Sequence, residues 1–167
     1  MLQKLKERRG QDGFTIIEVL IVLAIAGLIM LVVFLAVPAL QRNSRNTQRN
    51  NDVSALIGAL NEYVNNSGGQ IPASCSMTSC AFVDNAKLGF YESATDSALT
   101  FTKRTTAGVI AAPTGQDTSV INAGSFSTCN STGTASTATG ATARSVAFVY
   151  YVETGGDDPQ LQCKTAQ

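Results

Sequence analysis

The feature that most constrains this chain is an uninterrupted apolar run near the N-terminus, from Val19 to Leu40. The run holds 22 residues and contains no charged or amide side chain. A helix needs about 20 apolar residues to cross the roughly 30 Å hydrocarbon core of a bilayer. Inside lipid, every backbone N–H and C=O group must find its partner within the segment, so the run predicts a membrane-spanning helix.

Charged residues precede this run in a distinctive order. Glu18 stands directly before it, and four basic residues stand further upstream: Lys4, Lys6, Arg8 and Arg9. An ionisable group beside a spanning segment is costly in lipid, and by default it indicates a function. An ordinary secretory signal has a shorter apolar stretch with a small-residue cleavage site after it. Here the natural break precedes the apolar run, so the run would stay in the mature product.

The residues Gly13, Phe14, Thr15 and Glu18, with the apolar run behind them, resemble the N-terminus of a type IV prepilin. This class III signal is shared by type IV pilins and by the pseudopilins of type II secretion and DNA uptake. The resemblance covers Lys4 to about Val64. It implies that a prepilin peptidase cleaves between Gly13 and Phe14, and that Phe14 is then N-methylated. It also implies that Glu18 pairs with the Phe14 amine of a neighbouring subunit during fibre assembly.

The resemblance implies an α+β, type IV pilin-like fold, with a long N-terminal α-helix packed on a small antiparallel β-sheet head. The first half of that helix would be transmembrane. The implied partners are further copies of the chain, the prepilin peptidase, an assembly platform with its motor ATPase, and the membrane before assembly. Surfaces and DNA are further candidate partners. No cofactor, metal or catalytic residue is expected.

Four parts are expected along the chain: a cleaved leader at 1–13, a transmembrane and fibre-core helix at 14–40, an amphipathic continuation at 41–66, and an extracytoplasmic head at 67–167. Basic residues lie on both sides of the span, so charge alone does not fix its orientation. The resemblance and the cysteines place the N-terminus in the cytoplasm. The subunit would sit in the cytoplasmic membrane as a single pass and then in an extracellular pilus.

Gly27 and Pro38 are the weak points of the expected helix. Pro38 lacks a backbone donor and crowds the preceding turn, which kinks or loosens a helix. In related pilins a glycine and a proline bracket a section that melts when the subunit leaves the membrane. Gly27 falls at that glycine, whereas Pro38 lies three residues after the common position, which is Leu35 here. The alternative is that Pro38 marks the end of the membrane core.

Residues 41–52 are wholly polar, and Arg42, Arg45 and Arg49 share one helical face. Three interpretations stay open: a solvated face, contacts with lipid headgroups, or contacts with acidic groups of neighbouring subunits. An apolar stripe at helical spacing follows and needs a covering partner, most simply the C-terminal domain. The stripe consists of Val53, Leu56, Ile57, Leu60, Tyr63 and Val64. Gly68 and Gly69 are expected to end the helix.

Four cysteines in an exported domain indicate two disulfides, for which three pairings are possible. The favoured pairing is Cys75–Cys80 with Cys129–Cys163. The first pair is close in sequence, and type IV pilins often carry a disulfide in the C-terminal region that the second pair closes. A metal site built from all four cysteines is the alternative, but the usual pairs separated by two residues are missing.

In the head, residues 145–153 are apolar at alternate and intervening positions, which predicts a central strand with the helix on one side. Residues 161–164 would return antiparallel beside it. Weaker patterns suggest strands at 98–102 and 108–111 and a short helix at 81–88. Residues 113–143 are rich in Ser, Thr, Gly and Ala. Within them, 130–140 is expected to form an exposed loop, with O-linked sugars on its hydroxyls as the alternative.

The chain has no histidine and no tryptophan, which excludes a His-based zinc site and a Ser-His catalytic pair. No phosphate-binding glycine loop or nucleophile elbow is present. Glu153, Asp157 and Asp158 leave open a calcium loop, although their spacing matches no known one. Residues 1–13 hold four of the twelve basic and two of the twelve acidic side chains, so the mature net charge is −2. Bulk charge therefore gives no case for nucleic-acid binding.

The favoured function is a structural subunit of a type IV pilus, a surface filament of the kind that serves adhesion and twitching motility. One alternative is a pseudopilin of a secretion or DNA-uptake system. Another is a membrane-anchored binding module that never polymerises, and a hydrolase is the least favoured. The N-terminal resemblance says nothing specific about the head, so these alternatives stay open at this point.

Overall fold

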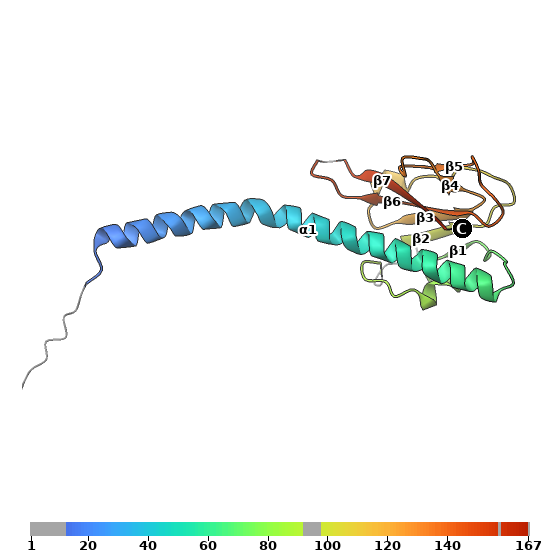
Figure 1. Ribbon diagram of the computed structural model, residues 1–167, viewed down its shortest axis with the longest axis horizontal. Helices are drawn as coiled ribbons and strands as arrows, with labels where there is room; N and C mark the ends of the chain where they lie inside the picture. Colours follow the sequence, from blue (N-terminus) through green and yellow to red (C-terminus); the bar gives the residue numbers. More distant parts are fainter. Residues whose placement is uncertain (1–12, 92–97, 157, 167) are drawn as a thin grey trace, which may run out of the picture. The chain divides into compact units, whose positions relative to one another are not determined.

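The computed structural model describes residues 13–91, 98–156 and 158–166 (Figure 1). It divides between Ala39 and Leu40 into two units. One long helix, α1 (Ile16–Asn66), runs through both. Among its described residues, the second unit adds these 3₁₀ helices and strands: η1 (Val83–Asn85), η3 (Thr114–Gln116), β1 (Cys75–Ser76), β2 (Leu99–Thr102), β3 (Ile121–Ser125), β4 (Thr128–Cys129), β5 (Ser136–Thr137), β6 (Val146–Val152) and β7 (Gln160–Ala166). The predicted α+β fold class is confirmed.

In the first unit, every described residue is exposed, from Gly13 to Ala39. By length and composition, its helix is apolar enough to cross a membrane. Soluble proteins rarely leave an apolar surface of this extent uncovered. None of the described residues covers this part of α1, which leaves an apolar surface suited to a membrane or to other apolar helices.

The second unit is built on a five-stranded sheet in the order β1-β2-β3-β6-β7 (Figure 1). β6 pairs antiparallel with both β3 and β7, as expected for the central strand and its returning neighbour. β2 confirms the strand predicted at 98–102, but it pairs parallel with β3. A parallel pair needs a long crossover, which residues 103–120 provide. β4 and β5 form a separate pair.

The two faces of β6 pack against different parts of the chain. Val146, Phe148 and Tyr150 join the stripe of α1 in the larger core, which includes Val53, Leu56 and Leu60. Ala147 and Val149 face a smaller cluster with Ile110 and Cys163. Side chains of a strand alternate between its faces, so the apolar character of both sets is explained by burial on both sides. The predicted partner of the stripe is thus the C-terminal sheet.

The strand predicted at 108–111 is wrong. The Ile110 N–H donates to Ser136 Oγ at 2.7 Å, and the Ser136 hydroxyl donates to the Ile110 carbonyl at 2.8 Å. The Ser136 side chain therefore pairs with both the N–H and the carbonyl of Ile110, which in a strand would pair with a neighbouring strand. A Cβ atom added to Gly124 would lie 2.3 Å from Cδ1 of Ile110, which is too close. The packing of Ile110 against β3 therefore requires glycine at position 124.

The loop predicted at 130–140 is also more structured than expected. It contains β5, and Ser136 is buried. The Gly133 carbonyl accepts a hydrogen bond from the Cys163 N–H at 2.7 Å, which ties the segment to β7. Only the three residues of η1 are helical within the predicted 81–88 helix. The surrounding 113–143 region also supplies β3, a strand that its small and polar composition did not indicate.

Two disulfides join Cys75 to Cys80 and Cys129 to Cys163, the pairing that the sequence favours. The first closes a short loop after β1, and the second fastens the β4 region to β7. At the end of α1, Gly68 and Gly69 have φ of 64° and 84°, and the Gly69 N–H donates to the Val64 carbonyl at 2.7 Å. This is the glycine stop that the sequence predicts.

Candidate functional site

The predicted cleavage point lies just ahead of the helix. Residues 13–15 are non-helical, α1 begins at Ile16, and the Phe14 side chain is 87% exposed. A Cβ on Gly13 would meet nothing within 4 Å. A peptide bond inside a helix would be shielded by its hydrogen bonds, whereas the Gly13–Phe14 bond is accessible to a protease. Both partners of the expected cleavage are therefore presented on open backbone.

Glu18 and Thr15 together form a capping box at the start of α1. The Thr15 N–H donates to Glu18 Oε2 at 2.9 Å, and the Thr15 hydroxyl donates to the same oxygen at 2.6 Å. In return, the Glu18 N–H approaches Thr15 Oγ1 at 3.4 Å. These contacts satisfy two of the N–H groups that the first turn of a helix leaves without partners.

The capping box fixes the Glu18 carboxylate at the mouth of the apolar segment. Carboxylates are favoured there, because the first turn of a helix carries partial positive charge. Cleavage after Gly13 leaves the box intact, since the Thr15 N–H belongs to the Phe14–Thr15 peptide. The resemblance to prepilins implied that Glu18 pairs with the Phe14 amine of a neighbouring subunit, but the contact between Glu18 and Thr15 of the same chain was not predicted. The signal was present in the Thr-Ile-Ile-Glu spacing of a capping box.

Gly27 and Pro38 both lie inside α1. A Cβ on Gly27 would meet nothing within 4 Å, so no contact in this chain requires glycine there. Pro38 interrupts the helical hydrogen bonds one residue before the boundary between the two units. Their expected part in helix melting stays a prediction.

A second polar site joins the segment after the apolar run to the end of β6. Glu153 accepts hydrogen bonds from two arginines of α1: Arg45 Nε at 2.9 Å and Arg49 Nη2 at 2.7 Å. The side chain of Arg45 is 42% exposed, whereas that of Arg49 is 2% exposed. We name the set Arg45, Asn46, Arg49 and Glu153 the Glu153 clamp.

Arg49 is the buried centre of this clamp. Besides Glu153, its guanidinium donates to the Thr118 carbonyl at 3.1 Å and to Asn46 Oδ1 at 3.0 Å, and it lies 4.2 Å from the centre of the Phe90 ring. Of the three interpretations left open for the arginine face, a solvated face is therefore wrong for Arg49. The signal was hidden because the partners other than Asn46 stand 41 to 104 residues away in the chain, and local periodicity carries no information about them.

Asparagine side chains extend the clamp along β6. Asn46 Nδ2 donates to the Glu153 carbonyl at 2.6 Å, and the Glu153 N–H donates to Asn46 Oδ1 at 2.9 Å. The amide thus pairs with the backbone at the end of β6 as a neighbouring strand would. One turn further along α1, Asn50 Oδ1 accepts from the Tyr150 hydroxyl, and Lys164 Nζ reaches the Asn50 carbonyl at 3.0 Å.

The protonation of these groups follows from their surroundings. The hydrogen bonds from Arg45 are the largest of the effects that lower the pKa of Glu153 to about 2; burial opposes them, and the hydrogen bond and charge of Arg49 and the charge of Arg45 lower the pKa further. Burial raises the pKa of Tyr150 to about 12, and it also raises the pKa of Tyr91. Desolvation lowers the pKa of Lys164. At neutral pH the clamp is therefore an ionised carboxylate held between two cations.

Asp52 anchors a loop against the same face of α1. Its buried carboxylate accepts hydrogen bonds from three successive backbone N–H groups, those of Gly89 at 2.8 Å, Phe90 at 2.7 Å and Tyr91 at 3.0 Å. Hydrogen bonds to an ionised acceptor are about twice as strong as neutral ones. Asp52 therefore holds the 89–91 backbone, and with it the Phe90 ring that contacts Arg49.

Replacing Asp52 by alanine is expected to lower the free energy of unfolding by about 2–3 kcal/mol, since three backbone donors lose their acceptor. Thermal unfolding of the full chain in detergent, with hydrogen exchange of the 89–91 amides, measures this. Exchange should rise at 89–91 first. The matched control is Asn51→Ala, a change at an exposed neighbouring position. Equal effects of the two substitutions would contradict the anchoring role.

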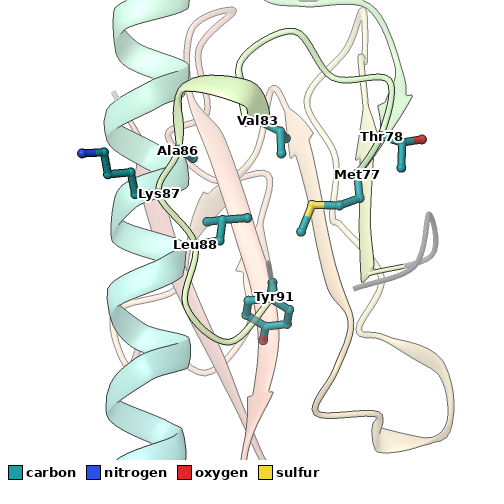
Figure 2. A pocket seen from close by; sticks show the side chains of 7 residues that line it. All are labelled: Met77, Thr78, Val83, Ala86, Lys87, Leu88 and Tyr91. Carbon is teal, nitrogen blue, oxygen red and sulfur yellow. The ribbon is translucent and has the colours of Figure 1, made fainter. Parts of the chain in front are cut away.

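A cavity of about 520 Å³ lies beside the 77–91 loop, lined by Met77, Thr78, Val83, Ala86, Lys87, Leu88 and Tyr91. In Figure 2, Met77 and Leu88 point toward each other and Lys87 points away. Tyr91 directly precedes residues 92–97, which are outside the described part of the chain. The described lining residues offer a phenol, a hydroxyl and an amine among mainly apolar side chains.

The calcium alternative finds little support in the described residues. Both oxygens of Glu153 already accept hydrogen bonds from arginine, and Asp157 lies outside the described residues. Over that same part of the chain, no group of three or more His, Cys, Asp or Glu side chains is placed to hold a metal ion. The four cysteines of the alternative metal site are consumed in the two disulfides.

Comparison with protein families matches the prokaryotic N-terminal methylation motif at residues 8–34. The matched segment contains the Gly13–Phe14 bond, the capping box and the first part of the exposed apolar helix. Comparisons with curated proteins and with solved structures found no match. The motif is that of a structural protein class, and with the apolar helix it indicates membrane anchoring. Residues 8–34 thus carry the prokaryotic N-terminal methylation motif, which is the class III signal peptide of type IV pilins.

Proposed function

We propose that this protein is the structural subunit of a type IV pilus. The observation that carries the proposal is the contrast between the two units. The first unit carries the methylation motif and leaves its apolar helix wholly exposed. The second unit buries its own apolar core and contains two disulfides and the Glu153 clamp. A subunit of this construction needs a lipid bilayer at first and sister helices afterwards.

The proposal divides the chain by role. Residues 1–13 form the leader that a prepilin peptidase removes, and Phe14 becomes the methylated N-terminus. Residues 14–40 lie in the membrane and then in the fibre core, 41–66 connect that core to the head, and 67–167 form the outer surface of the filament. Adhesion and twitching motility would be properties of the assembled filament.

Transfer from bilayer to fibre needs little apolar driving force, because lipid tails and packed helices are similarly apolar. Shape fit, polar contacts and an assembly motor must then decide the outcome. Glu18 is placed to provide the polar contact, since the capping box holds its carboxylate at the start of the apolar segment. An unpaired charge in that surrounding is expensive, whereas one matched to the Phe14 amine of a neighbour is tolerated.

N-terminal mass spectrometry of filaments sheared from the cell surface tests the proposal. The expected result is a peptide that begins at Phe14 and carries one methyl group. A processed protein without surface filaments, together with a secretion or transformation defect on deletion, would instead favour a pseudopilin. A protein that begins at Met1 and stays monomeric in detergent would refute assembly and favour the non-polymerising module.

A further inference from the structure

A groove of about 240 Å³ lies between β2, the neighbouring strand β3 and the segment 109–111. The side chains that matter for its chemistry are those of Thr100, Thr102, Arg104, Val109 and Asn122. Alternate residues of β2, Leu99 and Phe101, belong to the larger core that packs on α1. Because side chains alternate along a strand, the two threonines face the opposite way. The groove therefore lies on the face of the sheet that α1 does not cover.

Arg104 is held in place beside this groove by two other segments. The Arg104 N–H donates to Oγ of the buried Ser125 at 2.8 Å, and the Ser125 hydroxyl donates to the Arg104 carbonyl at 3.3 Å. The guanidinium lies against Gly108, where an added Cβ would stand 2.1 Å from Nη2. The backbone and the guanidinium of Arg104 are therefore both positioned by their neighbours.

The charge of Arg104 has no counter-charge in the part of the chain that the structure describes. Nη1 donates to the Val109 carbonyl at 3.2 Å, whereas the buried Nε has no acceptor, and the arginine makes no ion pair there. No carboxylate is among the described residues that line the groove. Asp117 is the one acidic residue in the sequence from 98 to 152, and its carboxylate accepts hydrogen bonds within its own turn. The local charge therefore favours an anionic ligand.

Neutral polar groups lie beside this cation. Thr100 and Thr102 are exposed, and their hydroxyls have no hydrogen-bond partner within the described residues. Thr100 is in register with Asn122 on the adjacent strand, so the two side chains are neighbours. The Asn122 nitrogen donates to the Ala111 carbonyl at 3.0 Å, which leaves Asn122 Oδ1 as an acceptor. An anion that also carries hydroxyl groups can use all of these groups, because its hydroxyls donate as well as accept.

We propose that this groove binds a sugar acid, with its carboxylate on Arg104 and its hydroxyls on the two threonines and Asn122. Arginine binds a carboxylate through two parallel N–H donors, which orients the ligand as well as holding it. The exposed Val109 side chain at the rim supplies an apolar contact for the C–H groups of the sugar ring. The site lies entirely in the second unit and requires neither the apolar helix nor assembly into a filament.

Titration of the full chain in detergent with glucuronate, followed by NMR of the backbone amides, tests this site. We expect saturable shifts at residues 100–104 and 109–111 with a Kd on the order of 1 mM, as suits a single sugar in an open groove. Glucose has a hydroxymethyl group in place of the carboxylate, and acetate lacks the hydroxyls. Each of these two probes should therefore bind at least about tenfold more weakly than glucuronate.

Variants of neighbouring residues locate the binding groups. Arg104→Gln should weaken glucuronate binding about tenfold or more. Its matched control is Lys103→Gln, which removes the same charge from the adjacent residue outside the groove lining and should bind within about twofold of the unchanged protein. Since Arg104 also packs within its own chain, the double variant Thr100→Val with Thr102→Val provides a second test. Valine suits a strand, so this variant should keep its unfolding midpoint and bind glucuronate about fivefold more weakly.

Three outcomes would overturn the site. Absence of saturable shifts up to about 50 mM glucuronate would refute binding itself. Equal affinities for glucuronate and acetate would reduce the groove to a general contact for anions. Equal losses in Arg104→Gln and Lys103→Gln would assign the effect to the charge of the region rather than to the groove. None of these outcomes bears on processing at Phe14 or on filament formation, so the proposed function is tested separately.

Discussion

Replacing Glu153 by alanine is expected to lower the free energy of unfolding by about 3 kcal/mol, because Arg49 is then left buried without its carboxylate. The Arg49 side chain is 2% exposed, so water cannot replace the lost partner. The backbone bonds between Glu153 and Asn46 remain in the variant, so the loss reports the charged contact. For a folded unit of this size, the midpoint of thermal unfolding should fall by about 10 °C.

Two control variants make this result specific. Glu62→Ala removes a carboxylate from an exposed position of α1 that makes no ion pair in the described structure, and it should leave the midpoint unchanged. Arg45→Ala should cost less than Glu153→Ala, because Arg45 is half-exposed and leaves the Arg49–Glu153 pair in place. Circular dichroism of the full chain in detergent measures all three. Equal midpoints for the Glu153 and Glu62 variants would contradict a stabilising clamp.

The same carboxylate predicts how stability depends on pH. Its pKa is about 2 in the folded chain against an ordinary value of 4.5, so the folded state holds fewer protons on this group than the unfolded state does. Stability from Glu153 is therefore complete above about pH 4.5 and is lost as the pH falls toward 2, by about 3 kcal/mol in all. Glu153→Gln should flatten that part of the pH profile.

The fold was largely predictable because its main elements are encoded locally. The apolar run, the stripe from Val53 to Val64 and the two glycines after it define α1 from end to end. Residues 145–153 are apolar on both faces because β6 is covered on both, and that pattern is legible without a structure. β3 was missed because its neighbours and a packed Ile110, rather than its own composition, make it a strand.

The polar site shows what local patterns cannot contain. Spacing placed Arg42, Arg45 and Arg49 on one helical face. It could not show which of them would pair with a distant carboxylate, or which would be buried. Glu153 was noticed only as a possible calcium ligand, and Asp52 was not noticed at all. Both act on groups that are remote in sequence, with Asp52 binding backbone N–H groups 37 to 39 residues away. Thr15 was different, since its spacing to Glu18 was visible and its capping role was overlooked.

Replacing Glu18 by alanine is expected to leave leader cleavage intact and to lower filament yield more than about tenfold, which corresponds to only about 1.4 kcal/mol of docking free energy. Cleavage should persist because Gly13 and Phe14 lie on open backbone outside the helix. Docking should fail because the Phe14 amine of the neighbour would enter an apolar bundle without a counter-charge. Leader removal is read from the mass of the membrane-bound subunit, and yield from sheared filaments.

Glu18 has two roles in this account, and Glu18→Gln separates them. Glutamine at this position still closes a capping box with Thr15, but it carries no charge. If Glu18 acts through the amine of the next subunit, the glutamine variant should assemble as poorly as the alanine variant. Thr15→Ala weakens the cap and keeps the carboxylate, so it should assemble within about twofold of the unchanged protein, because an exposed cap is worth only about 1 kcal/mol to the helix. Normal yield from Glu18→Gln, with a defect in Thr15→Ala, would instead assign Glu18 to helix capping alone.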